Sequence, residues 1–368
     1  MAITTALSNE QAIETAVAEI AAAITDSELK VVLYFASSVY DPEKLAASME
    51  QSFPGADVFG CTTAGELISG KMTKGSIVAM GLGADVIGDI DIQVVENVHL
   101  QDEITQAFKN FEEYYKLSSL EMDPEKYAGI ILVDGLSRAE EKVMDAVGNL
   151  TNVTFVGGSA GDDLKFEKTH VFAKGKAYSD AAVLALFKPA GEFDFIKTQS
   201  FCATEHKLLA TDVDEEKRIV FSFDGKPAAT AYAAAVNCQE QDLTTHFMEQ
   251  PLVLMIDGEP YVRSPQRTEN DAVIFYCNVK KGMEMAMLSS TDMLADTEKA
   301  LQEKNSQEKP IRALVNFHCI LRTLQLEKQG KTAEYGKVFS EIPTVGFSTY
   351  GEAYIGHINQ TSTMLVLY

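Results

Sequence analysis

Three stretches of the chain repeat one order of apolar and amphipathic segments. Each begins with a short apolar run, continues with a segment of helical periodicity, and returns to an apolar run that ends in a glycine-rich turn. A helix between two strands forms the crossover that joins parallel strands. The pattern therefore predicts an α/β fold with repeated strand-helix-strand-glycine-turn units. The first apolar runs span residues 30–37, 128–134 and 311–317, and the helical segments span residues 42–52, 138–150 and 320–339.

The three glycine turns, at residues 58–66, 155–163 and 344–352, share a further pattern. Each passes a glycine, a small hydroxyl residue and a second glycine, then reaches a carboxylate. Glycines permit positive φ or close approach, and free N–H groups in such turns form concave sites for polar or anionic groups. Ligands of open α/β sheets bind beyond the carboxyl ends of strands. We therefore expect the turns to lie near one shared cleft, although tight turns of a repeated fold would show the same pattern. The candidate ligand-binding residues in these turns are Gly60, Cys61, Thr62, Gly65, Glu66, Gly157, Gly158, Ser159, Gly161, Asp162, Gly346, Ser348, Thr349, Gly351 and Glu352.

The remaining segments divide the chain into two domains with mixed sheets. Residues 8–24 read as an amphipathic helix, in which Ser8 and Gln11 have capping-box spacing. Residues 76–83 and 87–95 read as the strands of one antiparallel hairpin. We place the domain boundary at the acidic stretch 212–216, which gives a first domain of residues 1–215 with an internal duplication and a second domain of residues 216–368.

Net charge and cysteine content exclude some classes of binding partner and indicate the cellular compartment. The 368 residues carry a net charge of −23, which argues against nucleic acid, whose phosphates need Lys and Arg, and against an anionic membrane surface. We see no secretory signal, and no apolar run approaches the ~20 residues that span a bilayer. The five cysteines are scattered and odd in number. These features predict a cytoplasmic protein with reduced thiols.

Two features suggest a reactive side chain, the serine of a GxSxG motif and the cysteine of the first turn, but each also has a simpler structural interpretation. Residues 157–161 match the GxSxG nucleophile elbow around Ser159, but a true elbow leads into a helix, and the residues that follow lack helical periodicity. We therefore expect a binding protein rather than a serine hydrolase. Cys61, inside the first turn, has either a lowered pKa next to free N–H groups or simply fills a buried turn. No HxxxH or HExxH pair occurs, so the sequence does not support a zinc site.

The sequence resembles the FIST family of bacterial sensory proteins over residues 28–366. The FIST N-terminal domain is suggested by residues 58–66 and 156–162, and the FIST C-terminal domain by residues 223–228, 261–265 and 345–352. The resemblance implies an intracellular sensor of small ligands such as amino acids. Residues 319–322, 261–265 and 357–361, which include Arg322 and Arg263, are similar to the branch that binds haem and senses nitric oxide. Signalling in that branch implies a separate histidine kinase or cyclic-di-GMP enzyme as the partner.

The two sensor readings make different demands on the site. For haem, we expect an axial histidine in the order His246, His318, His357, because His246 lies in a loop-like stretch with apolar neighbours that can turn toward a cofactor. For an amino acid, we expect Glu66, Asp162 or Glu352 to bind the ammonium group and the glycine N–H groups to bind the carboxylate. The sequence leaves the ligand and the oligomeric state open.

Overall fold

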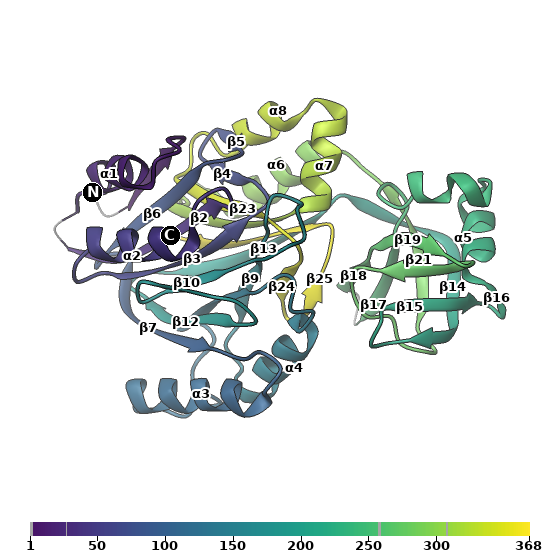
Figure 1. The fold of residues 1–368 in the computed structure, drawn as a ribbon, viewed down its shortest axis with the longest axis horizontal. Helices are drawn as coiled ribbons and strands as arrows, with labels where there is room; N and C mark the ends of the chain where they lie inside the picture. The colour runs from purple at the N-terminus through teal and green to yellow at the C-terminus, as the bar shows by residue number, and fades with distance from the viewer. Residues whose placement is uncertain (1–2, 27, 257–258, 307) are drawn as a thin grey trace. The chain divides into compact units, whose positions relative to one another are not determined.

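The computed structural model describes residues 3–26, 28–256, 259–306 and 308–368. The chain forms two compact units (Figure 1). Unit 1 contains residues 1–198, 297–357 and 362–368, and unit 2 contains residues 199–296 and 358–361. Helices and mixed sheets in two units confirm the predicted α/β fold. The units do not follow the predicted boundary after residue 215, because the last part of the chain returns to unit 1.

Unit 1 consists of three six-stranded sheets with one plan. At the centre of each sheet lies a parallel pair of strands joined by a helix, as the sequence predicts. These three strand-helix-strand units are β2 (Leu29–Ser37), α2 (Pro42–Ser52) and β3 (Asp57–Thr63); β8 (Ala128–Val133), α4 (Glu140–Leu150) and β9 (Phe155–Ser159); and β22 (Ala313–Cys319), α7 (Ile320–Gln329) and β23 (Thr344–Thr349). The predicted third helix is split into α7 and the short α8 (Thr332–Lys337), because Gly330 ends α7 in the left-handed region.

Each parallel pair is completed by the same antiparallel neighbours. A return strand pairs with the first strand of the pair, and an outer strand pairs with the return strand. The return strands are β6 (Ile77–Gly83), β12 (Ala182–Pro189) and β26 (Thr361–Leu367), and the outer strands are β1 (Ile3–Ser8), β7 (Ile87–Val95) and β13 (Phe193–Gln199). The outer strand of each repeat is followed by one more helix before the parallel pair: α1 (Ile13–Ala23), α3 (Gln101–Tyr115) and α6 (Met293–Lys304).

A hairpin after each glycine turn crosses to the sheet of another repeat. The hairpin of the first repeat pairs with β23, that of the third repeat pairs with β9, and that of the second repeat pairs with β3. Each sheet is therefore built from two repeats, and the exchange is cyclic. The hairpin strands are β4 (Glu66–Ile68) with β5 (Lys71–Thr73), β10 (Val171–Ala173) with β11 (Lys176–Tyr178), and β24 (Glu352–Tyr354) with β25 (His357–Ile358).

The third repeat is interrupted by unit 2, which is inserted between β13 and α6. Unit 2 holds an antiparallel sheet whose longest strand, β14 (Phe201–Asp214), was not recognised in the sequence. Residues of α5 (Ala228–Val236) pack on this sheet in a separate hydrophobic core. The remaining elements of unit 2 are β15 (Ile219–Phe223), β16 (Lys226–Pro227), η1 (Glu240–Thr245), β17 (Leu252–Ile256), β18 (Glu259–Arg263), β19 (Pro265–Glu269), β20 (Ala272–Phe275) and β21 (Glu284–Ser290).

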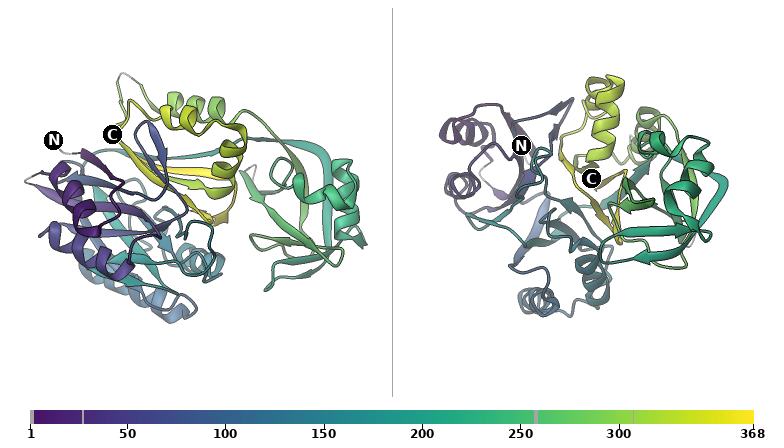
Figure 2. Two further views of the ribbon diagram at one scale, coloured as in Figure 1. Left: turned by 45° about the horizontal axis from the view of Figure 1, so that its top comes forward. Right: turned by 45° about the vertical axis from the view of Figure 1, so that its right-hand side comes forward.

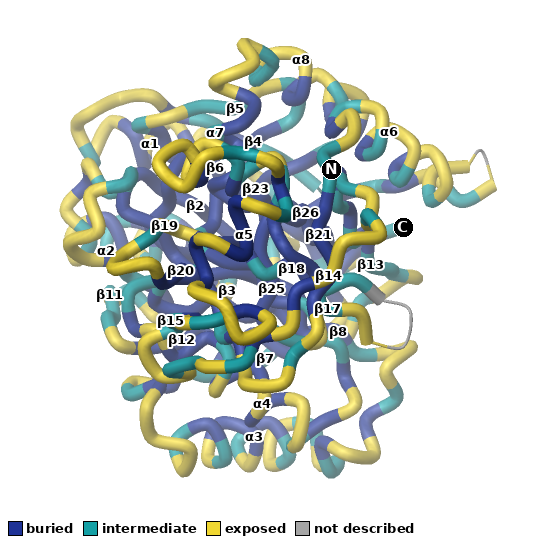
Figure 3. Tube along the Cα trace, turned by 90° about the vertical axis from the view of Figure 1, so that its right-hand side faces the viewer, coloured by how far each residue is buried: buried dark blue, intermediate teal, exposed yellow. Residues whose placement is uncertain are grey.

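The core of unit 1 lies where the inner faces of the three sheets meet. Phe35 packs against Phe317 and Phe347, with ring centroids 6.3 and 4.6 Å apart, and the same cluster includes Leu132 from the second repeat. β23 is buried along its length (Figure 3). The helices of unit 1 lie on the outside of the sheets (Figure 2), where they cover two further apolar clusters in the first and second repeats. Apolar burial on both faces explains the nearly continuous apolar runs of the parallel strands.

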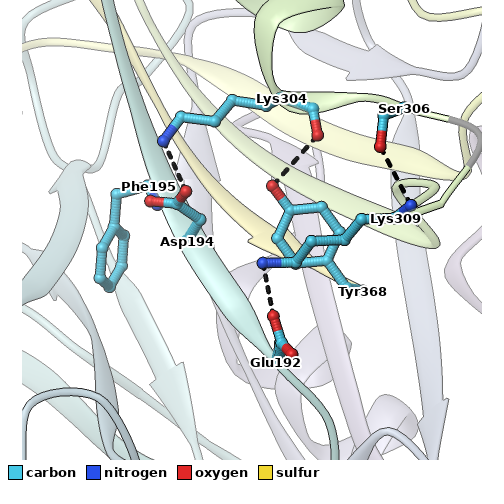
Figure 4. A network of polar contacts seen from close by, with 7 residues as sticks. All are labelled: Glu192, Asp194, Phe195, Lys304, Ser306, Lys309 and Tyr368. Atoms are coloured by element: carbon cyan, nitrogen blue, oxygen red, sulfur yellow. Dashed lines mark hydrogen bonds and ion pairs between the residues drawn. The ribbon is translucent and has the colours of Figure 1, made fainter.

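Ionic contacts join the two chain passages that lead to and from unit 2 (Figure 4). The Nζ of Lys304, at the end of α6, lies 2.5 Å from Asp194 Oδ2 on β13. Lys309 Nζ lies 2.6 Å from Glu192 Oε2 and 3.9 Å from the ring centroid of Tyr368. These contacts join the start of β13 to the end of α6 and the residues after it, all within unit 1.

Two local predictions are wrong because the segments concerned pair with strands that are distant in the sequence or belong to another sheet. Ser8 does not begin a helix: it ends β1, its hydroxyl donates to Glu19 Oε2 at 2.6 Å, and the helix begins at Ile13. The strands β6 and β7 do not form a hairpin, because each pairs within a different sheet. In the described part of the chain, we find no helix long and apolar enough to cross a membrane.

Candidate functional site

The three glycine turns lie together and bond to one another. Gly161 N–H donates to Thr62 O at 2.9 Å, Ala64 N–H donates to Ser348 O at 3.1 Å, and Ser159 N–H donates to Gly351 O at 2.9 Å. These bonds link the second turn to the first, the first to the third and the third to the second. The structure therefore brings the predicted turn residues to one place, at the carboxyl ends of the parallel strands.

The first glycine of each turn has a packing role. Gly60, Gly157 and Gly346 lie inside strands β3, β9 and β23. A Cβ atom there would lie 1.8, 1.8 and 2.1 Å from the carbonyl oxygen of the neighbouring parallel strand. Glycine is required for this close approach of two backbones rather than for a left-handed turn. Among the later glycines, Gly65 has a positive φ of 129°.

The expectation of free N–H groups in the turns is wrong for most of them. The N–H groups of Thr62, Ala160, Ser348 and Tyr350 donate to backbone carbonyls, in addition to the three bonds between the turns. Buried N–H groups that are already paired within the protein do not offer a site for an anion. Cys61 is fully buried in β3, and burial raises the pKa of its thiol, so it fills space in the core.

The carboxylate after each turn is buried. Glu66 accepts hydrogen bonds from Thr63 Oγ1 at 2.5 Å and from the hydroxyl and N–H of Ser76 at 2.6 and 3.1 Å. Burial nevertheless raises the pKa of Glu66 to about 7. Glu352 is fully buried in β24, where it pairs with Gly158. Of the three carboxylates predicted to bind an ammonium group, Glu66 and Asp162 are thus seen to bond to the protein itself.

Asp162 organises the loop that follows the second turn. Its carboxylate accepts the N–H groups of Phe166, Glu167 and Lys168 at 2.9, 2.6 and 3.0 Å, and the Tyr350 hydroxyl at 2.5 Å. Burial alone would raise the pKa of Asp162, but these hydrogen bonds outweigh it and hold the pKa below its usual value. A carboxylate with this many donors acts as a fixed anchor for the backbone.

The same loop, residues 162–168, is held in an unusual conformation by all three repeats. Asp163, Leu164 and Phe166 have φ values of 55°, 64° and 54°, a region that costs non-glycine residues about 1–3 kcal/mol each. The Asp163 carboxylate accepts the hydroxyls of Ser37 and Ser38 at 2.8 and 2.7 Å, at the end of β2. Tyr350, from the third repeat, stacks on Phe166, which is 55% exposed. Strain of this kind persists where the surroundings impose it and is found at functional sites.

A small open pocket of about 180 Å³ lies beside this loop, at the carboxyl ends of β2 and β3. Lys165 Nζ donates to Ser38 Oγ at 2.9 Å, and Lys165 and Lys168 form no ion pair within the described part of the chain. Burial and the nearby Lys168 lower the pKa of His170. The charged groups of the pocket are two lysines, Lys165 and Lys168, and two carboxylates, Glu167 and Asp162. Of the two carboxylates, Asp162 already accepts four hydrogen bonds from the protein. Its lining residues are Ser38, Tyr40, Pro42, Thr62, Asp162, Lys165, Glu167, Lys168 and His170.

Sequence reasoning missed Lys165, Lys168 and His170. Their one signal is a pair of lysines directly after a glycine turn in a chain with 54 acidic and 31 basic residues. The residues around these two lysines show no helical or strand periodicity, so in the sequence they look like an ordinary solvent-exposed loop. Only the fold brings it to Ser38 and Thr62.

The candidate haem ligands lie in different parts of the fold. His246 directly follows η1 in unit 2 and is half-buried, with its Nδ1 3.0 Å from Gln250 Oε1. His318 is fully buried on β22 of unit 1, and its Nδ1 lies 3.2 Å from the Tyr335 hydroxyl. The ring of His357 packs on Gly351, where a Cβ would lie 2.1 Å from His357 Cε1. Arg322 is buried in α7 of unit 1, whereas Arg263 belongs to β18 of unit 2.

Ser159 lacks the surroundings of a nucleophile elbow. It is buried at the end of β9, and the next element is the strand β10. An elbow requires a strand, a sharp turn and a helix, which exposes the serine hydroxyl.

Comparison with known proteins gives matches over most of the chain. The family model described as the FIST N domain matches residues 30–226, and the model described as the FIST C domain matches residues 228–354. The chain is also similar to Uncharacterized protein MJ1623 from Methanocaldococcus jannaschii, with 21% identity over 303 residues. That match covers 75% of this chain and 57% of the relative, so the chain spans little more than half the relative's length.

Proposed function

Because the chain belongs to the FIST family, whose domains are in general sensor domains for small ligands, we propose that it senses a small anionic metabolite bound in the pocket beside loop 162–168. The observation that carries this proposal is the convergence of all three repeats on a strained loop, next to two lysines that form no ion pair with any residue described by the structure. An amino acid or another small carboxylate suits a pocket of about 180 Å³ in which two lysines offer positive charge. Lys165 and Lys168 would bind the carboxylate, in place of the glycine N–H groups.

We further propose that the signal passes to a separate partner in the cytoplasm, a histidine kinase or a cyclic-di-GMP enzyme. The support is the resemblance of residues 261–265, 319–322 and 357–361 to the signalling branch of the family. Loop 162–168 provides a physical basis for a response. A ligand that contacts Lys165 and Lys168 would alter a segment whose conformation depends on hydrogen bonds to all three repeats.

Changing both lysines to glutamine is expected to weaken anion binding by about tenfold or more, since each removes a charge-assisted contact. The Lys165→Gln/Lys168→Gln protein would be titrated calorimetrically with glutamate, succinate and inorganic phosphate at fixed ionic strength. Lys176→Gln is the matched control, because Lys176 is an exposed lysine on β11 outside the pocket. Equal affinity of the double variant and the wild type for every anion that binds would rule out this pocket.

Haem is the second candidate ligand, and the geometry of His246 favours it. The side-chain oxygen Oε1 of Gln250 faces Nδ1 of His246, so Nδ1 carries the proton and Nε2 keeps the lone pair that a metal needs. Such a contact on the other ring nitrogen is usual for metal-ligating histidines. Haem would supply an iron centre for nitric oxide. The chain's part is to hold the imidazole of His246 next to Phe247, which is buried in the core of unit 2.

Haem titration of three single variants tests this candidate. We expect His246→Ala to lose the Soret band of the bound form, and His318→Ala and His357→Ala to keep it. His318 and His357 are enclosed by Tyr335 and Gly351, whereas His246 is half-buried. A spectrum of His246→Ala identical to that of the wild type would exclude this ligand.

A further inference from the structure

The third repeat differs from the other two in the layer between its sheet and its helices. Parallel register identifies the equivalent residues. Opposite Gly60 and Thr62 lie Tyr34 and Ala36, and opposite Gly157 and Ser159 lie Ile131 and Val133. These four residues belong to the apolar clusters under α1 to α4. In the third repeat, the residues opposite Gly346 and Ser348 are Asn316 and His318.

Asn316 and His318 are part of a buried group that we call the inner polar cluster: Asn316, His318, Arg322, Thr323, Tyr335, Ser348 and Ser362. Ser362 Oγ donates to Asn316 Oδ1 at 2.8 Å, and the Thr323 and Ser348 hydroxyls lie 2.7 Å apart. Arg322 Nη2 donates to Thr297 Oγ1 at 3.3 Å, and its guanidinium carbon lies 6.0 Å from the Tyr335 ring centroid. All seven residues are at most 3% exposed.

Two side-chain nitrogen atoms in the cluster have no hydrogen-bond partner among the described residues. These are Asn316 Nδ2 and His318 Nε2. The Tyr335 hydroxyl faces His318 Nδ1; when it donates there, Nε2 carries the proton. Burial and the nearby Arg322 hold the pKa of His318 well below its usual value, so the ring is neutral. A buried donor without a hydrogen-bond partner lowers the stability of the folded protein by about 1–3 kcal/mol. Two such donors on one face of β22 are unusual.

The fold does not need this polarity. The first and second repeats build the same strands and helices with Tyr34, Ala36, Ile131 and Val133 at the equivalent positions. Replacing buried polar groups by well-packed apolar ones is often neutral or stabilising. Asn316 and His318 are therefore not required by the strand-helix-strand architecture that the three repeats share.

We propose that the inner polar cluster is a second binding site, for a small carboxylate, enclosed between β22 and helices α7 and α8. Asn316 Nδ2–H and His318 Nε2–H face the same side of the strand, and both can donate to carboxylate oxygens. The guanidinium of Arg322 adds positive charge on that side. The site is distinct from the pocket beside loop 162–168, since the two share no residues.

The second repeat suggests the variant that tests this site. Asn316→Ile/His318→Val gives the third repeat the side chains that Ile131 and Val133 have at the equivalent positions of the second. We expect the double variant to unfold at a higher temperature than the wild type without anion. The comparison is made in the Lys165→Gln/Lys168→Gln protein, which lacks both lysines of the first pocket. Formate and acetate, against sodium chloride at equal ionic strength, should raise the unfolding temperature of this protein. Adding Asn316→Ile/His318→Val to it should abolish the rise.

A second measurement keeps the proposal falsifiable if the double variant fails to fold. In the wild type, formate should shift the ¹⁵N resonance of His318 Nε2, and Asn316→Ile alone should weaken the apparent affinity by about tenfold. An Nε2 resonance that neither formate nor acetate moves would mean that water alone occupies the cluster, which would overturn the proposal. An anion response that survives when Asn316→Ile/His318→Val is added to the Lys165→Gln/Lys168→Gln protein would overturn it equally.

Discussion

Gly157→Ala is expected to prevent unit 1 from folding stably. The new Cβ would lie 1.8 Å from Ile131 O and 2.7 Å from Ile131 C. These are backbone atoms of a strand held in register on both edges, so they cannot move aside as a flexible side chain does. Overpacking of this severity belongs with substitutions that cost more than about 4 kcal/mol. Urea unfolding followed by circular dichroism measures the loss.

Gly148→Ala is the matched control. Gly148 lies in α4 of the same repeat, and a Cβ there would meet no atom within 4 Å. Alanine in a helix interior is favoured over glycine by about 0.5–1 kcal/mol, so this variant should be slightly more stable than the wild type. A Gly157→Ala protein as stable as the Gly148→Ala protein would show that the parallel pair β8–β9 is not packed as described.

Asp162→Ala is expected to release loop 162–168 and to lower the free energy of unfolding by about 3 kcal/mol or more. The substitution removes four hydrogen bonds to a charged acceptor, each worth about 1.5–3 kcal/mol, and the loop can recover part of this by moving into water. Hydrogen exchange of the N–H groups of Phe166, Glu167 and Lys168 measures the release. Glu167→Ala is the control, because it keeps the backbone of the loop and alters only an exposed side chain.

The contribution of Asp162 also has a defined pH dependence. Its pKa is lower in the folded protein than the ordinary value of 3.8, so the unfolded chain binds its proton first as the pH falls. The stabilisation is complete above pH 3.8 and is lost as the pH falls toward the folded-state pKa. Protection of the three N–H groups should fall in the same range. Protection that does not change between pH 5 and the acid limit of folding would contradict the role given to Asp162.

The strand-helix-strand units follow from local sequence alone. In residues 42–52, helical spacing, Asp41 as N-cap and Pro42 in the first turn all agree, and the helix has the predicted bounds. The repeated order of the segments also predicts that three turns occupy equivalent positions. These features were predictable because periodicity, capping and turn chemistry act within a few residues of one another.

Strand partners depended on the tertiary structure. β6 and β7 are adjacent in sequence and apolar, yet they pair in different sheets. The hairpins exchange between repeats, and the third repeat closes unit 1 around an insertion of about a hundred residues. A strand that is buried on both faces carries no signal for its partner, since any apolar neighbour satisfies it locally. The predicted boundary after residue 215 falls inside unit 2, because the acidic stretch 212–216 lies where β14 turns back to pair with β15 and is not a linker between units.

The sequence by itself determined that three glycine turns end parallel strands, and it located them at the carboxyl ends where the repeats meet. Only the tertiary structure decided that their N–H groups are used within the protein, and that Lys165 and Lys168 lie beside Ser38, more than a hundred residues away in the chain. Asn316 and His318 were visible as polar residues in an apolar run. Their difference from Ile131 and Val133 appeared only with the register of the parallel pairs, because equivalence between repeats is a property of strand pairing and is not encoded in any local pattern.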